Sequence, residues 1–188
     1  MLASASPRRR ELLARLGVPF TLRPAGIDES PLPGEAPERL AVRLALAKAR
    51  AAARDAPAGS TILGADTVVA LDGELLAKPE DAAEARGMLG RLSGREHEVW
   101  TGVAVVGPDD AERSGAQCTR VRFRTLGAAE IARYAASGEP LDKAGGYAIQ
   151  GGAAAFVESV DGDTDNVVGL PLGLVVELLG LSPVNRRT

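Results

Sequence analysis

The N-terminal segment combines small hydroxyl residues with a run of arginines. Residues 4–10 read Ser-Ala-Ser-Pro-Arg-Arg-Arg, and a helix-like run follows as far as Gly17. Ser6 is suited to cap this helix and Pro7 to its first position. Free backbone N–H groups, hydroxyls and guanidinium groups at a helix start favour a phosphate. A capped surface helix with solvated arginines is the alternative, but the helix dipole disfavours cations there, so the segment predicts an anion-binding site.

Asp66 is the one charged residue in an apolar run, residues 60–71. Such a run predicts a strand buried on both faces, where a carboxylate is costly unless it is paired, hydrogen-bonded or bound to a metal. Asp72 and Gly73 then predict a tight turn, and the return strand ends near Lys78, which this hairpin could bring back toward Asp66. Composition alone makes Asp66 the best catalytic candidate, whereas Lys78 alone would be an ordinary charge at a strand edge.

The rare residue types restrict the chemistry further. His97 is the single histidine and Cys118 the single cysteine, which argues against a zinc site, a serine–histidine triad and an intrachain disulfide. We expect His97 to be a surface or hydrogen-bonded residue and Cys118 a buried thiol. A metal would have to be held by carboxylate oxygens, which favours Mg²⁺ or Mn²⁺.

Composition sets the class of protein. The chain has 188 residues, 45% of them hydrophobic, which suits one domain over residues 1–188 or two small lobes that share a core. A net charge of −3 and six aromatic residues argue against nucleic-acid binding. No apolar run reaches transmembrane length and the segment 4–10 leaves no room for a signal peptide, so we expect a soluble cytoplasmic protein with no membrane partner.

Helices and strands are predicted in alternation along the chain. Helices are expected over residues 7–17, 37–54, 82–92, 128–136 and 172–179, and strands over 18–23, 60–71, 74–77, 99–106, 117–124 and 154–160, with a short strand before the first helix. The stretch 139–152 is rich in glycine, which indicates either a loop whose backbone closely approaches a ligand or a flexible surface loop. The tail 183–188 is expected to fray. On sequence alone, Glu29 belongs to a solvated turn and Lys48 to a solvated helix face.

Five segments in this order resemble the Maf family: residues 4–9, 64–69, 78–79, 142–151 and 167–171. The match is collinear from Leu2 to about Leu179. Members are described as septum-formation inhibitors and as nucleoside triphosphate pyrophosphatases, related in fold to the inosine triphosphate pyrophosphatases. The resemblance implies an α/β fold with a mixed, bent sheet and flanking helices, in two lobes around a cleft. Members are often dimeric, so a homodimer is an assembly that the resemblance allows.

The resemblance also assigns roles residue by residue. It implies catalytic roles for Asp66, Glu29, Lys78 and Lys48, and substrate contacts from Arg8, Arg9, Thr67 and Gln150. The chemistry of the segment 4–10 adds Ser4 and Ser6 to the substrate contacts. Asp66 and Glu29 are the expected ligands of a divalent metal cation, Mg²⁺ or Mn²⁺, and Asp66 would activate the water either directly or through that metal. Within the arginine run, Arg9 is expected to hold phosphate, Arg8 to contribute to substrate choice, and Arg10 to face solvent.

The expected reaction is hydrolysis of a nucleoside triphosphate between its α- and β-phosphates, which needs charge neutralisation, an aligned water and a base. The amide of Gln150 offers an acceptor and donors that match the N3–H and carbonyls of uracil and thymine. The Asp-Lys-Ala-Gly form of residues 142–145, together with Gln150, resembles the subgroup that cleaves dTTP and UTP rather than the one favouring 7-methyl-GTP. The resemblance therefore predicts dTTP and UTP, with modified pyrimidine nucleotides among the candidates. The competing hypothesis is a non-catalytic, nucleotide-sensing regulator of septum formation. Asp66 argues against it, because binding alone needs no carboxylate beside phosphates.

Overall fold

The computed structural model describes residues 1–181. Its centre is a five-stranded antiparallel sheet in the order β2-β1-β3-β4-β5. The strands are β1 (Ile62–Leu71), β2 (Glu74–Leu76), β3 (Glu96–Val106), β4 (Glu112–Phe123) and β5 (Val157–Asp161). The predicted α/β class with helices flanking a sheet is confirmed. The strands of the sheet pair antiparallel throughout, and parallel pairing occurs at the isolated bridges of Leu2 with Leu22 and Leu63.

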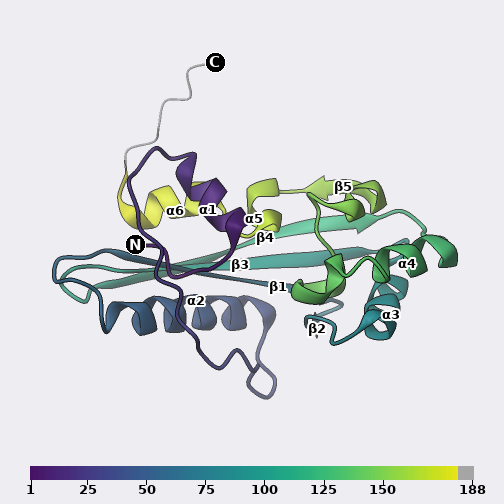
Figure 1. Ribbon diagram of the computed structural model, residues 1–188, viewed down its shortest axis with the longest axis horizontal. Coiled ribbons are helices and arrows are strands. Elements are labelled where there is room, and N and C mark those ends of the chain that lie inside the picture. The colour runs from purple at the N-terminus through teal and green to yellow at the C-terminus, as the bar shows by residue number, and fades with distance from the viewer. Residues whose placement is uncertain (182–188) are drawn as a thin grey trace.

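Helices cover both faces of the sheet (Figure 1). They are α1 (Pro7–Ala14), α2 (Pro37–Ala53), α3 (Ala82–Leu92), α4 (Ala128–Ala135), α5 (Thr164–Val168) and α6 (Leu172–Leu179), with short 3₁₀ helices at Glu139–Asp142, Ala144–Gly146 and Gly152–Phe156. Helix α2 packs along one face against β1 and β3, and α5 and α6 lie with α1 on the other. Helices α3 and α4 pack together at the end of the sheet near β2. The predicted burial of the central strand on both faces is confirmed.

Helix α2 lies unusually close to the sheet because two glycines face it. A Cβ atom on Gly64 would lie 2.2 Å from the carbonyl oxygen of Ala45, and one on Gly102 would lie 2.2 Å from that of Ala41. These glycines sit on the neighbouring strands β1 and β3, and their helix partners are fully buried alanines. Small residues on both sides therefore allow backbone to approach backbone, and this contact fixes the height of α2 above the sheet.

Two apolar clusters lie at different positions on the face of the sheet opposite α2. One cluster joins α1 and α6 to β1 and β3, and includes the fully buried Leu2 and Leu170. Another lies between the sheet, α3, α4 and the segment around Tyr147, and has Phe123 at its centre. None of the helices within residues 1–181 is long and apolar enough to span a membrane.

Three predicted elements differ from those observed. Residues 18–23 form no regular strand, because prolines at positions 19 and 24 limit backbone donors and only Leu22 makes a bridge in the structure of residues 1–181. The predicted strand 154–160 begins as a 3₁₀ helix, and its strand starts at Val157. The segment before Pro171, for which no helix was predicted, contains α5, capped by the Asp163 side chain.

Within residues 1–181, the short strand predicted before the first helix is also absent as a regular strand, and only the isolated bridges of Leu2 occur in its place. The other predicted helices and strands are present, several of them with shifted ends. Strands β3 and β4 begin at Glu96 and Glu112, earlier than predicted, because their long antiparallel pairing extends past the apolar residues on which the prediction relied. Cys118, expected to be buried, is half-buried, and its thiol is free. The predicted frayed tail, 183–188, lies outside the described residues.

Candidate active site

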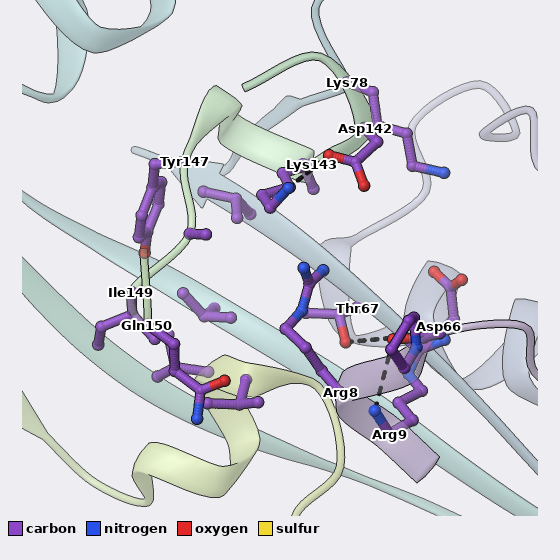
Figure 2. A pocket seen from close by; sticks show the side chains of 18 of the residues that line it. Arg8, Arg9, Asp66, Thr67, Lys78, Asp142, Lys143, Tyr147, Ile149 and Gln150 are labelled. Carbon is purple, nitrogen blue, oxygen red and sulfur yellow. Dashed lines mark hydrogen bonds and ion pairs between the residues drawn. The ribbon is translucent and has the colours of Figure 1, made fainter. Parts of the chain in front are cut away.

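A cavity of about 360 Å³ opens between the start of α1, the middle of β1, the end of α5 and the glycine-rich segment 142–150 (Figure 2). Lys48 of α2, Lys78 and Val99 of β3 complete its lining. Its size is that of an ordinary small-molecule site. Cations outnumber carboxylates among the side chains that line it. The cations are Arg8, Arg9, Lys48, Lys78 and Lys143, and the carboxylates are Asp66 and Asp142. This excess of positive charge suits a polyanion.

The start of α1 forms one wall of the cavity. Ser6 caps the helix, because its hydroxyl accepts a hydrogen bond from the backbone N–H of Arg9, and Pro7 occupies the first turn. Arg8 is half-buried and lines the cavity, whereas Arg10 is exposed, as predicted. Ser4 lies behind the cavity wall, buried, and its hydroxyl accepts from the backbone N–H of Ser6.

The guanidinium of Arg9 ties three segments together. Its Nε donates to the carbonyl of Gly169 at 2.8 Å, Nη2 to the hydroxyl of Thr67 at 3.0 Å, and Nη1 to the hydroxyl of Ser4 at 3.4 Å. Burial lowers the pKa of this guanidinium and the charge of Asp66 opposes that effect. A guanidinium has five N–H groups, so two remain for a ligand. Arg9 is thus both a structural tie and a fixed positive charge in the cavity.

A buried chain of hydrogen bonds supports Thr67 from behind. The hydroxyls of Thr67 and Thr101 lie 2.9 Å apart, and Thr101 lies within 2.9 Å of the backbone carbonyl of Asn166. The amide of Asn166 donates to the carbonyl of Val99 and the hydroxyl of Thr119. Thr101 and Asn166 are fully buried. This series of hydrogen bonds connects the Arg9 side of the cavity with β3, β4 and α5.

Lys48 joins the two candidate carboxylates. Its ammonium lies 2.5 Å from a carboxylate oxygen of Glu29 and 2.5 Å from one of Asp66. Lys78 contacts the other oxygen of Glu29 at 3.3 Å, so the hairpin brings it to Glu29 at the cavity that Asp66 also lines. Burial raises the pKa of the Glu29 carboxyl, but the hydrogen bonds and charges of the two lysines outweigh burial, and the pKa lies below its ordinary value. Glu29 is therefore ionised at neutral pH.

The carboxylates of Asp66 and Glu29 suit a hard divalent cation whose other ligands are water and substrate phosphates. Within residues 1–181 no cluster of three or more His, Cys, Asp and Glu side chains could hold a metal ion, so the protein alone offers no full coordination shell. Mg²⁺ is commonly held by one or two carboxylates, with water and substrate phosphates as the remaining ligands. Asp66 and Glu29, which Lys48 brings together, fit that requirement.

The opposite end of the cavity is less charged. Figure 2 shows Tyr147, Ile149 and Gln150 on one side, Asp66 and Arg9 on the other, and Arg8 between them. Tyr147 is buried, and its hydroxyl lies 2.8 Å from Nε2 of His97. His97 is also buried rather than on the surface, and its Nδ1 has no hydrogen-bond partner within residues 1–181. Burial lowers the pKa of His97 to about 4.

The glycine-rich segment is held in place by its own charges. The ammonium of Lys143 donates to the carbonyl of Glu139 at 2.9 Å and contacts Asp142. Gly145 has a φ of +69° and packs against Val69 of β1, where a larger residue would collide. The segment is thus packed against the sheet and lines the cavity, whereas close approach of its backbone to a ligand stays a prediction.

The structure brings most of the predicted site residues together. Those that line the cavity are Ser6, Arg8, Arg9, Lys48, Asp66, Thr67, Lys78 and Gln150. Ser4 and Glu29 lie behind this set and contact it, through Arg9 and through the two lysines respectively. Asp142, Lys143 and Tyr147 also line the cavity but were not among the predicted site residues. Asp142 and Lys143 entered the prediction only as part of the loop that resembles one subgroup of the family, and the glycine-rich composition of the segment was the signal for all three.

The model of the family described as Maf-like protein matches residues 1–181. The chain belongs to the Maf family. A relative from Myxococcus xanthus is 57% identical over 95% of this chain and 90% of its own, and one from Symbiobacterium thermophilum is 52% identical over 95% and 91%. A relative from Sphingopyxis alaskensis is 56% identical over 92% of this chain and 90% of its own. All three are named dTTP/UTP pyrophosphatase.

A solved structure from Mycobacterium abscessus gives a more distant match for this Maf chain. It is described as a nucleoside-triphosphatase / dITP/XTP pyrophosphatase and is 23% identical. The match covers 66% of this chain and 74% of that one, with a TM-score of 0.42.

Proposed function

We propose that this Maf protein hydrolyses dTTP and UTP between the α- and β-phosphates, releasing the nucleoside monophosphate and pyrophosphate. The observation that carries the proposal is the difference in charge between the two ends of the cavity. One end gathers cations around Asp66 and Glu29, and the other presents the Gln150 amide beside Tyr147 and Ile149. The names of relatives at 52–57% identity support the same substrates.

The cationic end would bind the triphosphate. Arg8, Lys78 and the remaining N–H groups of Arg9 neutralise the phosphate oxygens, and the capped start of α1 adds its dipole and backbone donors, with the Ser6 hydroxyl nearby. Fixed positive charges stabilise the transition state of phosphoryl transfer, because negative charge spreads over the transferred group and the leaving oxygen.

Asp66 would accept the proton of the attacking water. The new P–O bond forms from the water oxygen, the bond between phosphorus and the bridging oxygen breaks, and pyrophosphate departs with the electron pair. Lys48 would orient Asp66, because its ammonium lies 2.5 Å from the carboxylate.

A divalent cation, Mg²⁺ or Mn²⁺, completes the proposal. Asp66 and Glu29 would hold it. When bound, it supplies Lewis-acid polarisation of the phosphates and lowers the pKa of bound water. With the cation bound, the arginines and lysines would still bind the phosphates, Lys48 would still orient Asp66, and Asp66 would still accept the proton.

The end of the cavity that carries Gln150 would determine which nucleobase binds. A glutamine amide can accept from N3–H of uracil or thymine while donating to a neighbouring carbonyl. Thr67 and Arg8, between the two ends, would contact the central part of the nucleotide. We further propose that residues 1–188 act as one two-lobed domain in the cytoplasm; a homodimer stays a prediction.

The proposal is tested by pyrophosphate release from a panel of canonical and modified nucleoside triphosphates, with Mg²⁺ and with chelator. We expect turnover of dTTP and UTP above that of the purine nucleotides, and its loss with chelator. Asp66→Asn should lower kcat by about 10²–10⁴-fold, the usual contribution of a general base, while nucleotide still binds. A wild-type protein that binds nucleotide without turning it over would support the alternative, a nucleotide-sensing regulator. Faster turnover of a modified GTP would contradict the substrate assignment.

A further inference from the structure

Arg43 connects α2 with the loop that carries Glu29. Its Nε donates to one carboxylate oxygen of Glu35 at 2.6 Å, and its Nη2 donates to the other at 2.7 Å. Nη2 also donates to the backbone carbonyl of Ser30 at 3.0 Å. The arginine therefore grips the loop at two positions, one directly after Glu29 and one farther along. Bidentate pairing of this kind fixes geometry as well as distance.

Hydrogen bonds between Leu32 and Glu35 form a turn in the loop beside the Arg43–Glu35 ion pair. The Glu35 carboxylate also accepts from the backbone N–H of Leu32 at 3.0 Å, and the Glu35 N–H donates back to the carbonyl of Leu32. The side chain of Glu35 is 8% exposed and that of Arg43 33%. The hydrogen bonds from Arg43 lower the pKa of Glu35 to about 2, with burial opposing them. The carboxylate thus stays ionised and keeps its donors through the pH range in which the protein would work.

Glu29 lies between two anchors. On its N-terminal side, Ile27 packs against the cluster that includes Leu40 and Leu44 of α2. On its C-terminal side, Arg43 holds Ser30 to the same helix. The Glu29 side chain itself is 42% exposed and reaches the site through Lys48 and Lys78. Its placement therefore depends on a loop that has little core of its own.

We propose that Arg43 is a positioning residue, which clamps the loop to α2 through Glu35 and Ser30 and so holds the Glu29 carboxylate at the active site. The proposal rests on the proposed function for its kinetic consequence, because it takes Glu29 to act in hydrolysis. The same helix carries Lys48 and Arg43, so one rigid element sets both partners of Glu29, the ammonium that it contacts and the clamp on its loop.

The chain offers a matched control on the same helix. Arg50 makes a bidentate pair with Glu112, with both N–O distances 2.6 Å, and this pair ties α2 to β4 rather than to the loop. Both ion pairs are partly exposed, so neither is expected to contribute much to global stability. The Arg43 pair is the more buried of the two, so urea denaturation of both variants must accompany the comparison. At equal free energies of unfolding, a difference between the two substitutions reports on the loop and the site.

Hydrogen exchange tests the clamp without reference to turnover. In Arg43→Gln we expect faster exchange of the amides of residues 28–35, in particular that of Leu32, which loses the ordered Glu35 carboxylate as its acceptor. In Arg50→Gln exchange in this loop should stay at the wild-type rate. Unchanged loop exchange in Arg43→Gln would overturn the clamp, whatever the activity.

A double-mutant cycle tests the link to Glu29. Arg43→Gln should lower kcat by about 10–100-fold with a smaller change in KM, since a misplaced catalytic group costs rate on that scale. Arg43→Lys should retain part of the rate, and Arg50→Gln should stay within about 2-fold of wild type. In a Glu29→Gln background, Arg43→Gln should cause little further loss.

Two results would overturn this link. One is an equal loss from Arg43→Gln with and without Glu29, which would mean that Arg43 acts elsewhere. The other is an equal loss from Arg50→Gln, which would mean a general effect of α2. A wild-type protein inactive on every nucleoside triphosphate would instead overturn the proposed function and with it the kinetic part of the inference, while hydrogen exchange would still decide whether the clamp exists.

Discussion

The cations of the site differ in how firmly the protein holds them. Arg9 donates from all three of its nitrogens to protein oxygens, and Lys48 lies against two carboxylates. Arg8 lines the cavity from the first turn of α1 and is half-buried. A site needs both kinds, because fixed charges preorganise the environment of the transition state and adjustable ones follow the substrate. We infer that Arg9 and Lys48 set the geometry and that Arg8 adapts to the nucleotide.

We expect the choice of nucleobase to depend on one residue, Gln150. Gln150→Glu replaces the donors of the amide with a second acceptor, so a carbonyl of uracil or thymine would face a carboxylate oxygen. We expect kcat/KM for dTTP and UTP to fall by about 10–100-fold, the cost of a hydrogen bond lost with an unpaired polar group. The measurement is pyrophosphate release from dTTP, UTP and GTP by both proteins. An equal loss on all three nucleotides would show that Gln150 has a structural role.

At the scale of elements, the approach of α2 to the sheet decides where Lys48 lies. The helix meets β1 and β3 through glycine and alanine, so its backbone lies almost directly on β3 and on β1, the strand that carries Asp66 and Thr67. Its side chains therefore reach the cavity from an element that is itself tightly fixed. Arg43 attaches the loop that carries Glu29 to this fixed helix, through hydrogen bonds to Ser30 and Glu35.

A substitution at Gly64 tests this contact. In Gly64→Ala the new Cβ would lie 2.2 Å from the Ala45 carbonyl oxygen and 2.9 Å from the Ala49 nitrogen, so the helix must move away. We expect a loss of about 1–3 kcal/mol or more in the free energy of unfolding, with lower activity through the displaced Lys48. Urea denaturation and pyrophosphate release measure the two effects.

Gly87→Ala is the control for that experiment. Gly87 lies in α3, and a Cβ there would meet nothing within 4 Å. Because alanine is the better helix former, the free energy of unfolding should rise by up to about 1 kcal/mol. A Gly64→Ala protein as stable as wild type would mean that α2 does not depend on this close approach.

At the scale of the whole molecule, stability should depend on pH through the buried core around Phe123. His97 packs edge-on against Phe123 and Tyr147, and burial lowers its pKa from 6.5 to about 4. Between these two pH values the unfolded chain binds a proton at the imidazole and the folded chain does not. The free energy of unfolding therefore falls as pH falls through this window, and this group accounts for up to about 3 kcal/mol.

The comparison with His97→Gln isolates this contribution. The variant keeps a polar group that can reach the Tyr147 hydroxyl but does not titrate, so the difference in free energy of unfolding between the two proteins should change between pH 6.5 and about 4 and stay constant above pH 7. Urea denaturation across this range measures the difference. Parallel stability curves for the two proteins would contradict a buried, neutral imidazole.

Local patterns in the sequence determined much of this protein. The capped start at Ser6 and Pro7, the turn at Asp72 and Gly73 and the apolar run around Asp66 each depend on neighbouring residues, and each occurs as predicted. The resemblance to the Maf family, carried by five short segments, supplied roles for Glu29 and Lys48. Composition and spacing alone had left both as solvated charges.

Tertiary structure alone decided which distant groups meet. The hydrogen bond from Arg9 to Gly169 joins residues far apart in the chain. The contacts of Lys48 with Glu29 and Asp66, and those of Arg43 with its loop, join different elements across turns of the chain. Such contacts follow from the register of β1 against β3 and from the height of α2 above them, which are set by packing over the whole core. A short window of sequence records the residue types that can bind phosphate, but their mutual distances depend on that packing.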